Sequence, residues 1–317
     1  MSTTTHNELP QDFNSLIEVI EYFSDEKKCL NYLLAQRFDG SIYCPHCGNE
    51  KVYSFSDGIR FKCGACRQQF TAKVGTIFEG SKIPMKKWFT AIYLVTSHKK
   101  GISSHQLAKD IKVTQKSAWF MLHRIRFALA TGSFETKMGD GGETVEIDET
   151  FVGGKLINMH EKKRDAAKLN PHHNKTVVIG MIERGGQVRT MVIPNTTIEV
   201  MQTKVIDNIS SNAHLVTDSH QSYKSLYQVY DNHRMIKNVE GHKTVGKYHT
   251  NNIEGYWSLL KRSIIGIYHY VSPKHLQAYC DETAYRYNTR TINEGNRVAL
   301  TLSKSNKRLT YNTLIAK

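Results

Sequence analysis

Three acidic side chains and one lysine stand at positions where they could act on phosphodiester bonds. Asp148 and Asp218 each end a short apolar run, which is the pattern of a strand end, and Glu254 lies in a segment that predicts a helix. Lys261 follows Glu254 two helical turns later, so both side chains share one helix face. Carboxylates that converge from separate elements can hold two Mg²⁺ or Mn²⁺ ions, one for the attacking oxygen and one for the leaving oxygen.

Any one of these acids alone would carry little weight. A lone Asp at a strand end is more often a cap or a turn residue than a metal ligand. The combination of two strand-end acids, a helix acid and a trailing lysine favours the metal site. Asn251 and Asn252 are alternatives for the third position, since an amide oxygen can bind a hard cation, but Glu254 is preferred because it carries charge. His249 is a candidate auxiliary residue.

A second candidate metal site lies earlier in the chain. Residues 52–55 and 59–61 flank Asp57-Gly58, which predicts a hairpin, and a CxxC pair lies on each side of it. This spacing predicts a zinc ribbon, a closed structural site of four thiolates. The alternative, a pair of redox motifs, lacks the strand and helix context, and His46 is treated as a bystander. The predicted zinc ligands are Cys44, Cys47, Cys63 and Cys66.

The composition favours a nucleic-acid partner. The chain has 317 residues, enough for two or three domains, and a formal net charge of +14 that is spread along it. Phosphate contacts supply most non-specific DNA affinity, whereas the alternative is a basic protein with a solvated face. No apolar window is long enough to predict a membrane span, and the first residues do not resemble a signal peptide. We therefore expect a cytoplasmic, nucleoid-associated protein.

Helical patterns dominate the first 130 residues. Residues 13–37 predict two short helices, the second capped by Ser24. Within the helical segment 84–130, a short helix over 103–110, a turn and a longer helix capped by Thr114 form a helix-turn-helix pattern. The alternative is an ordinary three-helix subdomain. The candidate DNA-binding residues at or near the start of the longer helix are Lys112, Gln115, Lys116 and Ser117.

Strand patterns follow a Gly-rich linker over 131–142. Three predicted strands are followed by a helix that Thr196 or Thr197 caps, by a strand over 215–217 and by helices. This order is that of a ribonuclease-H-like core, so the expected fold class is α/β (α+β overall) with a mixed sheet. The His-rich segment 155–175 predicts a mobile loop. A final helix begins at Ser272-Pro273, and the basic tail after it predicts partial disorder.

These patterns together divide the chain into five predicted parts. They are N-terminal helices in 1–40, a zinc ribbon in 41–75, a helical DNA-binding segment in 76–135, a catalytic domain in 143–290 and a basic tail in 291–317.

From about residue 13 to 290, the chain resembles bacterial insertion-sequence transposases that carry an N-terminal zinc ribbon and a DDE core. The set of matching phrases is highly specific, although no single phrase is. Besides the two cysteine motifs, these phrases are Gly75–Phe78, Lys100–Ser104, Ile147–Gly154, Val216–Asp218 and Glu254–Arg262.

The resemblance implies a function. It places Asp148, Asp218 and Glu254 on the acidic triad of the family and Lys261 on its trailing basic residue, with Mg²⁺ as cofactor and the terminal inverted repeats of the element as DNA partner. We expect hydrolytic nicking that frees a 3′-hydroxyl, attack of that hydroxyl on target DNA, and at least a dimer on DNA. Arg262 would join Lys261 in holding phosphates of the cut strand. The alternatives are a domesticated DNA-binding regulator without cleavage activity and a nuclease that cuts without joining.

Overall fold

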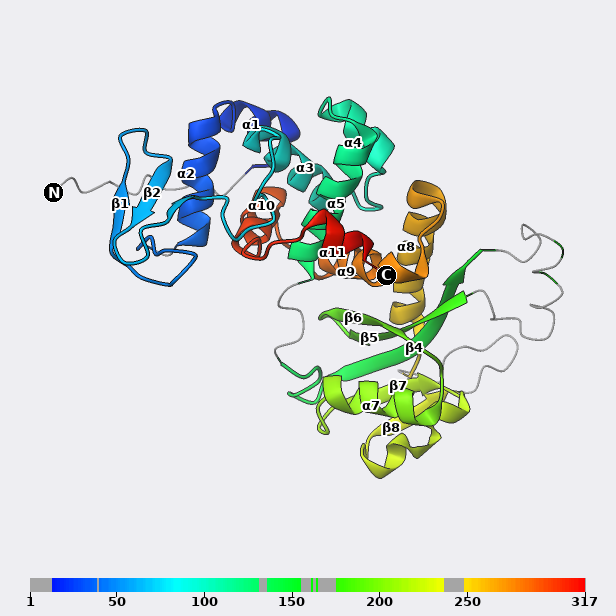
Figure 1. Ribbon diagram of the computed structural model, residues 1–317. Coiled ribbons are helices and arrows are strands. Elements are labelled where there is room, and N and C mark those ends of the chain that lie inside the picture. The colour runs from blue at the N-terminus through cyan, green and yellow to red at the C-terminus, as the bar shows by residue number, and fades with distance from the viewer. Residues whose placement is uncertain are drawn as a thin grey trace. The chain divides into compact units, whose positions relative to one another are not determined.

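The computed structural model describes residues 13–38, 40–130, 136–154, 161, 164, 175–236 and 248–316. The chain forms two compact units (Figure 1). The first unit contains Met1–Thr131 together with Thr289–Lys317, and the second contains Gly132–Asn288. The second unit is therefore an insertion between two parts of the first.

Two short helices begin the described part of the first unit, as the sequence predicted. Helix α1 spans Leu16–Tyr22 and helix α2 spans Glu26–Arg37. The predicted cap of α2 is wrong: Asp25, not Ser24, accepts a hydrogen bond from the backbone N–H of Lys28, at 3.1 Å. A carboxylate at the next position outcompetes the hydroxyl, because it is a stronger acceptor for the unpaired N–H groups of the first turn.

The ribbon folds as an antiparallel sheet of three strands, β1 (Val52–Ser54), β2 (Arg60–Cys63) and β3 (Gln69–Thr71). The predicted hairpin is confirmed. Its turn uses Asp57, which accepts from the backbone N–H groups of Ile59 and Arg60, and Gly58, whose φ is +65°. Strand β3 was not predicted from the sequence.

The predicted helix-turn-helix elements are also present. Helix α3 spans Met85–Ser97, α4 spans Ser104–Asp110 and α5 spans Gln115–Leu129. The side chains of Ser103 and Thr114 cap α4 and α5 by accepting from backbone N–H groups. Both caps stand where the sequence placed the helix starts.

The segment after residue 288 differs from the expected disordered tail. It contains α10 (Glu294–Ser303) and α11 (Tyr311–Ile315), and α10 packs against α2 and α3. The buried guanidinium of Arg124 donates to the carbonyl of Leu309, at 3.1 Å, so this segment is part of the first unit. Prediction of a tail was wrong because the surfaces that stabilise these helices lie about two hundred residues earlier in the chain.

The second unit is built on one sheet of five strands, in the order β6-β5-β4-β7-β8. The first three strands are antiparallel, and β7 and β8 run parallel to β4. This mixed sheet is that of the predicted ribonuclease-H-like core. The strands are β4 (Thr144–Gly153), β5 (Lys175–Glu183), β6 (Val188–Ile193), β7 (His214–Asp218) and β8 (His233–Ile236).

Helices cover both faces of this sheet (Figure 1). Alternate strand residues such as Val145 and Ile147 pack against α7 (Ile198–Asn208) and the 3₁₀ helix η2 (Gln221–Gln228) on one face. The other face packs against α8 and α9, which are Asn251–Ser263 and Leu276–Asn288. The two-residue period of the strands therefore buries both faces, which leaves the strand ends and sheet edges to carry polar groups.

Other sequence expectations for this unit have mixed outcomes. Thr197, one of the two proposed caps, precedes α7, whereas β8 and η2 were not predicted. Met138, assigned to the linker, is buried in the core and bridges to Ile209. Nearly all of the predicted loop 155–175 lies outside the described residues. Among the described residues, no helix is long and apolar enough to cross a membrane.

Candidate active-site pocket and metal centre

Strand register brings the first two acids together. Parallel strands β4 and β7 pair Ile147 with Thr217, so Asp148 and Asp218 are the next residues on neighbouring strands. Beyond this point β7 leaves the sheet while β4 continues to Gly153, which opens space beside the two carboxylates. The backbone N–H of His220 donates to Asp218, at 2.9 Å, and fixes this side chain as the chain turns away.

Helix α8 supplies the other two residues. Its buried stripe, with Ile253, Trp257 and Leu260, packs on the sheet, and Glu254 and Lys261 therefore lie on a neighbouring stripe. Both line one pocket of about 320 Å³ together with Asp148 and Asp218. All four predicted active-site residues thus meet in one pocket, although they come from three elements. The other lining residues are Glu149, Thr150, Thr250, Trp257 and Ser258.

Asp148 lies in an environment that disfavours the charged form of its carboxyl group. Burial raises the pKa of Asp148 to about 7, and the nearby charges of Glu149 and Asp218 act in the same direction. The indole Nε1 of Trp257 donates to its Oδ2 at 2.9 Å and partly offsets this effect. The carboxyl therefore has a fixed orientation in a site that strongly favours a positive neighbour.

Glu149 is a pocket residue that the sequence analysis did not select. Its Oε2 accepts from the hydroxyl of Tyr223 at 2.7 Å, and burial raises its pKa. Strand alternation assigns Glu149 to the opposite face from Asp148. Its position in the strand could have identified it. Where β4 extends beyond the end of β7, residues on both faces of β4 border the same opening.

Asn252, one of the two alternatives for the third acid, and His249, the candidate auxiliary residue, contact another group. The amide Nδ2 of Asn252 donates to the Oε1 of Glu146 at 2.7 Å, and His249 Nδ1 lies 3.3 Å from the same oxygen. Neither residue lines the pocket, and neither does Asn251, the other alternative for the third acid, whereas Glu254 does. Of the three candidates, only Glu254 is placed to act there.

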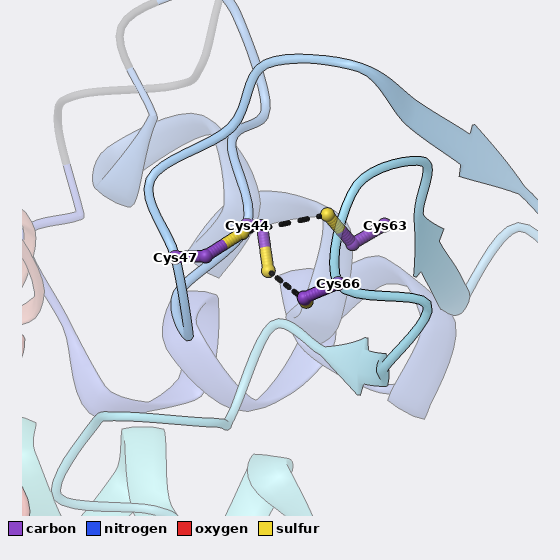
Figure 2. A group of neighbouring side chains, drawn as sticks. All are labelled: Cys44, Cys47, Cys63 and Cys66. Carbon is purple, nitrogen blue, oxygen red and sulfur yellow. Dashed lines mark hydrogen bonds between the residues drawn. The ribbon is translucent and has the colours of Figure 1, made fainter.

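The four cysteines form a compact cluster in the ribbon (Figure 2). All four sulfur atoms lie within 4.8 Å of one another. The Cys44–Cys66 sulfur pair is 3.7 Å apart and the Cys47–Cys63 pair is 3.6 Å apart. Zinc–sulfur bonds of about 2.3 Å at tetrahedral angles separate neighbouring sulfurs by roughly 3.8 Å. The cluster therefore fits a structural zinc ion.

The electrostatics of the cluster agree with this geometry. Burial alone would raise the pKa of Cys63, but the backbone N–H groups of Cys66 and Ala65 that point to it lower the pKa to about 6. A backbone hydrogen bond from Gln68 lowers the pKa of Cys66, but burial and hydrogen bonds with the other three thiols outweigh it and raise that pKa to about 12. The metal-free cluster therefore favours one thiolate, at Cys63, and deprotonation of the others depends on a bound cation. Among the described residues, no His, Asp or Glu side chain is part of this cluster. Within that described part of the chain, no other group of three or more Cys, His, Asp or Glu side chains gathers as closely.

The predicted DNA-binding residues lie at the turn and start of α5, and one lies on α8. Lys112, Gln115 and Lys116 are exposed, Ser117 is partly buried, and Arg262 is exposed. Lys112 adopts a left-handed backbone with φ of +49° and accepts from Lys87 Nζ at 2.8 Å, so the tight turn is held from α3. Gln115 donates to Ser104 at 2.9 Å, and this bond joins the two helices.

Family models match two parts of this chain. Residues 140–288 match the ISXO2-like transposase domain, and residues 24–69 match the transposase zinc-ribbon domain. A relative from Halobacterium salinarum, described as an uncharacterized protein in transposable element ISH50, is 25% identical over 257 residues. That match covers 77% of this chain and 84% of the relative. The chain is therefore a member of the insertion-sequence transposases that join a zinc ribbon to an ISXO2-like, ribonuclease-H-like domain.

Proposed function

We propose that this transposase binds the terminal inverted repeats of its element and catalyses Mg²⁺-dependent cleavage and strand transfer of DNA. The observation that supports the proposal most directly is the pocket shared by Asp148, Asp218, Glu254 and Lys261. Three carboxylates and a lysine on one open, polar surface match the needs of phosphodiester chemistry.

The donor set of the pocket fits a hard divalent cation. Its lining offers carboxylate oxygens and hydroxyls without a thiol or an imidazole, and such oxygen ligands favour Mg²⁺ or Mn²⁺ over softer metals. Burial raises the pKa of Asp148, and repulsion from Glu149 and Asp218 raises it further, so bound cations would relieve this repulsion. Asp148, Asp218 and Glu254 are the ligands that we assign, and Glu149 is close enough to assist.

In this proposal, each side chain has a definable task. Bound Mg²⁺ would supply Lewis-acid activation of the attacking and leaving oxygens. Trp257 orients Asp148 through the indole hydrogen bond, and Thr250 Oγ1 donates to Glu254 at 3.2 Å and orients that carboxylate. Lys261, exposed at the pocket border, would hold a phosphate of the cut strand, with Arg262 beside it along the DNA.

The first unit would recognise the element ends. The start of α5 presents exposed Gln115 and Lys116 at the position from which a recognition helix reads the major groove. The zinc ribbon would add phosphate contacts. We expect two or more copies to bridge the two ends of the element, since strand transfer must bring both ends to one target.

A strand-transfer assay tests this function. A labelled DNA end of the element, Mg²⁺ and a target plasmid are incubated with the protein, and joined products are separated from cut products. Wild type is expected to cut and join, and Asp148→Asn is expected to lose both products, because such a ligand is essential to the metal site. Glu199→Gln serves as the matched control, since Glu199 is an exposed acid on α7 in the same unit.

The outcomes separate the alternatives. Joined product that depends on Asp148 and Mg²⁺ supports a transposase. Cleavage without joining would instead indicate a nuclease, and a mobility shift without either product would indicate a DNA-binding regulator. Joining by the Asp148→Asn protein would show that the assigned pocket is not the active site.

A further inference from the structure

Glu146 is a fully buried acid that lies next to the pocket without lining it. Its exposed fraction is 0%, and it precedes Asp148 by two residues on β4. Because side chains of a strand alternate, Glu146 and Asp148 point to the same face, the one that α8 covers. The same strand therefore presents two carboxylates to α8.

Glu146 caps α8 from another element. Its Oε2 accepts from the backbone N–H groups of Asn252, at 2.9 Å, and Ile253, at 3.2 Å. These are N–H groups of the first helical turn, which have no partner inside the helix. Thr250, the residue that precedes α8, provides no side-chain cap. A local cap would stabilise the helix alone, whereas this one also fixes where the helix begins on the sheet.

The other oxygen of Glu146 completes the clamp. Its Oε1 accepts from Asn252 Nδ2 and from Arg184 Nε, both at 2.7 Å. Arg184, which directly follows β5, also donates to the carbonyl of His249 at 2.9 Å and so holds the chain that leads into α8. Both oxygens meet only donors among these contacts. A carboxylate suits this site better than an amide, whose NH₂ group would face other donors.

A second contact fixes the same helix one turn later. Trp257 donates to Asp148 and lies over Gly180, the residue paired with Asp148 on β5. A Cβ at Gly180 would lie 2.5 Å from the indole ring, so the close approach of α8 requires glycine there. Glu254 lies between the two anchored segments of the helix.

We infer that Glu146 is a positioning residue, which sets the register of α8 on β4 and thereby the separation between Asp148 and Glu254. This inference rests on the proposed function, because it assumes that these two carboxylates hold the same metal ions. Outer groups that orient metal ligands usually change metal affinity or activity by about 10- to 100-fold when they are removed.

A metal titration of the full-length protein tests this role without requiring turnover. Tb³⁺ binds oxygen ligands as Mg²⁺ does, and its luminescence is excited by a nearby indole, here Trp257. Glu146→Gln is expected to weaken Tb³⁺ binding about tenfold and to raise the Mg²⁺ concentration for half-maximal cleavage by a similar factor. Its affinity for the DNA end and its zinc content should match those of wild type. Glu199→Gln is the control, because it removes an exposed acid from the first turn of α7.

The results separate this inference from the proposed function. If wild type binds no Tb³⁺ at the pocket, the metal site itself is wrong. If wild type binds Tb³⁺ and folded Glu146→Gln binds it equally well, the positioning role is wrong. Should Glu146→Gln fail to fold, Arg184→Lys decides: it keeps the charge but loses the guanidinium geometry. A threefold or greater loss of Tb³⁺ affinity there supports the role, and unchanged affinity overturns it.

Discussion

The thiolate cluster and the carboxylate pocket differ in how the chain assembles them. The cysteines lie within one short stretch, Cys44–Cys66, and their sulfurs gather within 4.8 Å on a small three-stranded sheet. The carboxylates come from β4, β7 and α8, and they line an open pocket of about 320 Å³. The first site closes around an ion and needs little else, whereas the second depends on the whole second unit.

This difference accounts for what each site can do. Four thiolates fill the coordination of zinc and leave no position for a substrate, so the ribbon site is structural. An open pocket with spare oxygen donors and a lysine at its border leaves room for a phosphate. The closed site should therefore be sensitive to loss of any ligand, and the open site should be sensitive to small shifts in the elements that carry its ligands.

The largest expected effect is loss of zinc from the ribbon. Cys44→Ser, or a strong chelator, should unfold residues 44–71, because zinc binding contributes on the order of 10 kcal/mol to such sites. DNA-end affinity should fall sharply, while Tb³⁺ binding in the other unit remains. The measurements are zinc content, NMR amide dispersion of the ribbon, and the Tb³⁺ titration. A ribbon that keeps its amide dispersion without metal would contradict the assignment.

The next effect tests the sensitivity of the open pocket to a small shift. Gly180→Ala places a methyl group against the Trp257 ring and should cost about 1–3 kcal/mol of stability by overpacking. DNA cleavage should fall about 10- to 100-fold, because α8 must move away from Asp148. Gly255→Ala is the matched control: a Cβ there meets no atom within 4 Å, and alanine favours the helix. Thermal melts and cleavage rates measure both, and equal rates would argue against tight packing of α8.

A third prediction concerns an acid whose pKa is raised by burial rather than by neighbouring acids. Burial raises the pKa of Asp281 on α9 to about 6, partly offset by a hydrogen bond from Gln277, and this residue lies outside the pocket. Since the folded pKa exceeds the usual value, the carboxyl favours folding at low pH, and this contribution is lost as pH rises from about 4 to about 6. Asp281→Asn should therefore be the more stable protein above pH 6, by up to about 3 kcal/mol.

Unfolding of both proteins across this pH range measures the effect. The stability difference should widen between pH 4 and 6 and then stay constant. Added Mg²⁺ should leave that difference unchanged, since Asp281 is not assigned to the metal site. A difference that is independent of pH would show that Asp281 is not destabilised by burial.

The smallest expected effect concerns a surface charge. Lys116→Ala should weaken binding of the DNA end about 3- to 10-fold and lower the dependence of binding on salt by about one phosphate contact. Lys27→Ala, which removes an exposed lysine from α2, is the control. Fluorescence anisotropy at several salt concentrations measures both. Equal losses of DNA affinity in the two variants would favour the alternative of a generally basic surface without a specific DNA-binding helix.

The two sites also differ in how far the sequence predicts them. Cys44, Cys47, Cys63 and Cys66 are readable because the ligands and the hairpin between them lie in one segment. The helices of the first unit were predictable from caps such as Ser103 and Thr114, which act on their own neighbours. Local signals of this kind need no knowledge of the fold.

Contacts between residues that lie far apart in the sequence could not be predicted from local patterns. The strand-end pattern selected Asp148 and Asp218, but only the register of β4 and β7 makes them adjacent. From its position in the sequence, Glu146 could not be told from an ordinary strand residue, because its partners Arg184 and Asn252 lie far along the chain. Helix α10 was missed for the same reason, although its cap, Asn293, is a standard one.

The chain leaves the first unit near Thr131 and returns to it at Thr289. During synthesis, the cysteine ribbon and helices α1–α5 emerge from the ribosome long before α10, which packs against α2 and α3. Glu294 of α10 accepts a hydrogen bond from the hydroxyl of Tyr93, at 2.7 Å. The second unit emerges whole before α10 does. A chain that stopped near residue 288 would therefore contain the whole second unit and an incomplete first unit. If the first unit recognises DNA ends, as proposed, such a shortened product would keep the carboxylate pocket but lack part of the unit that recognises DNA.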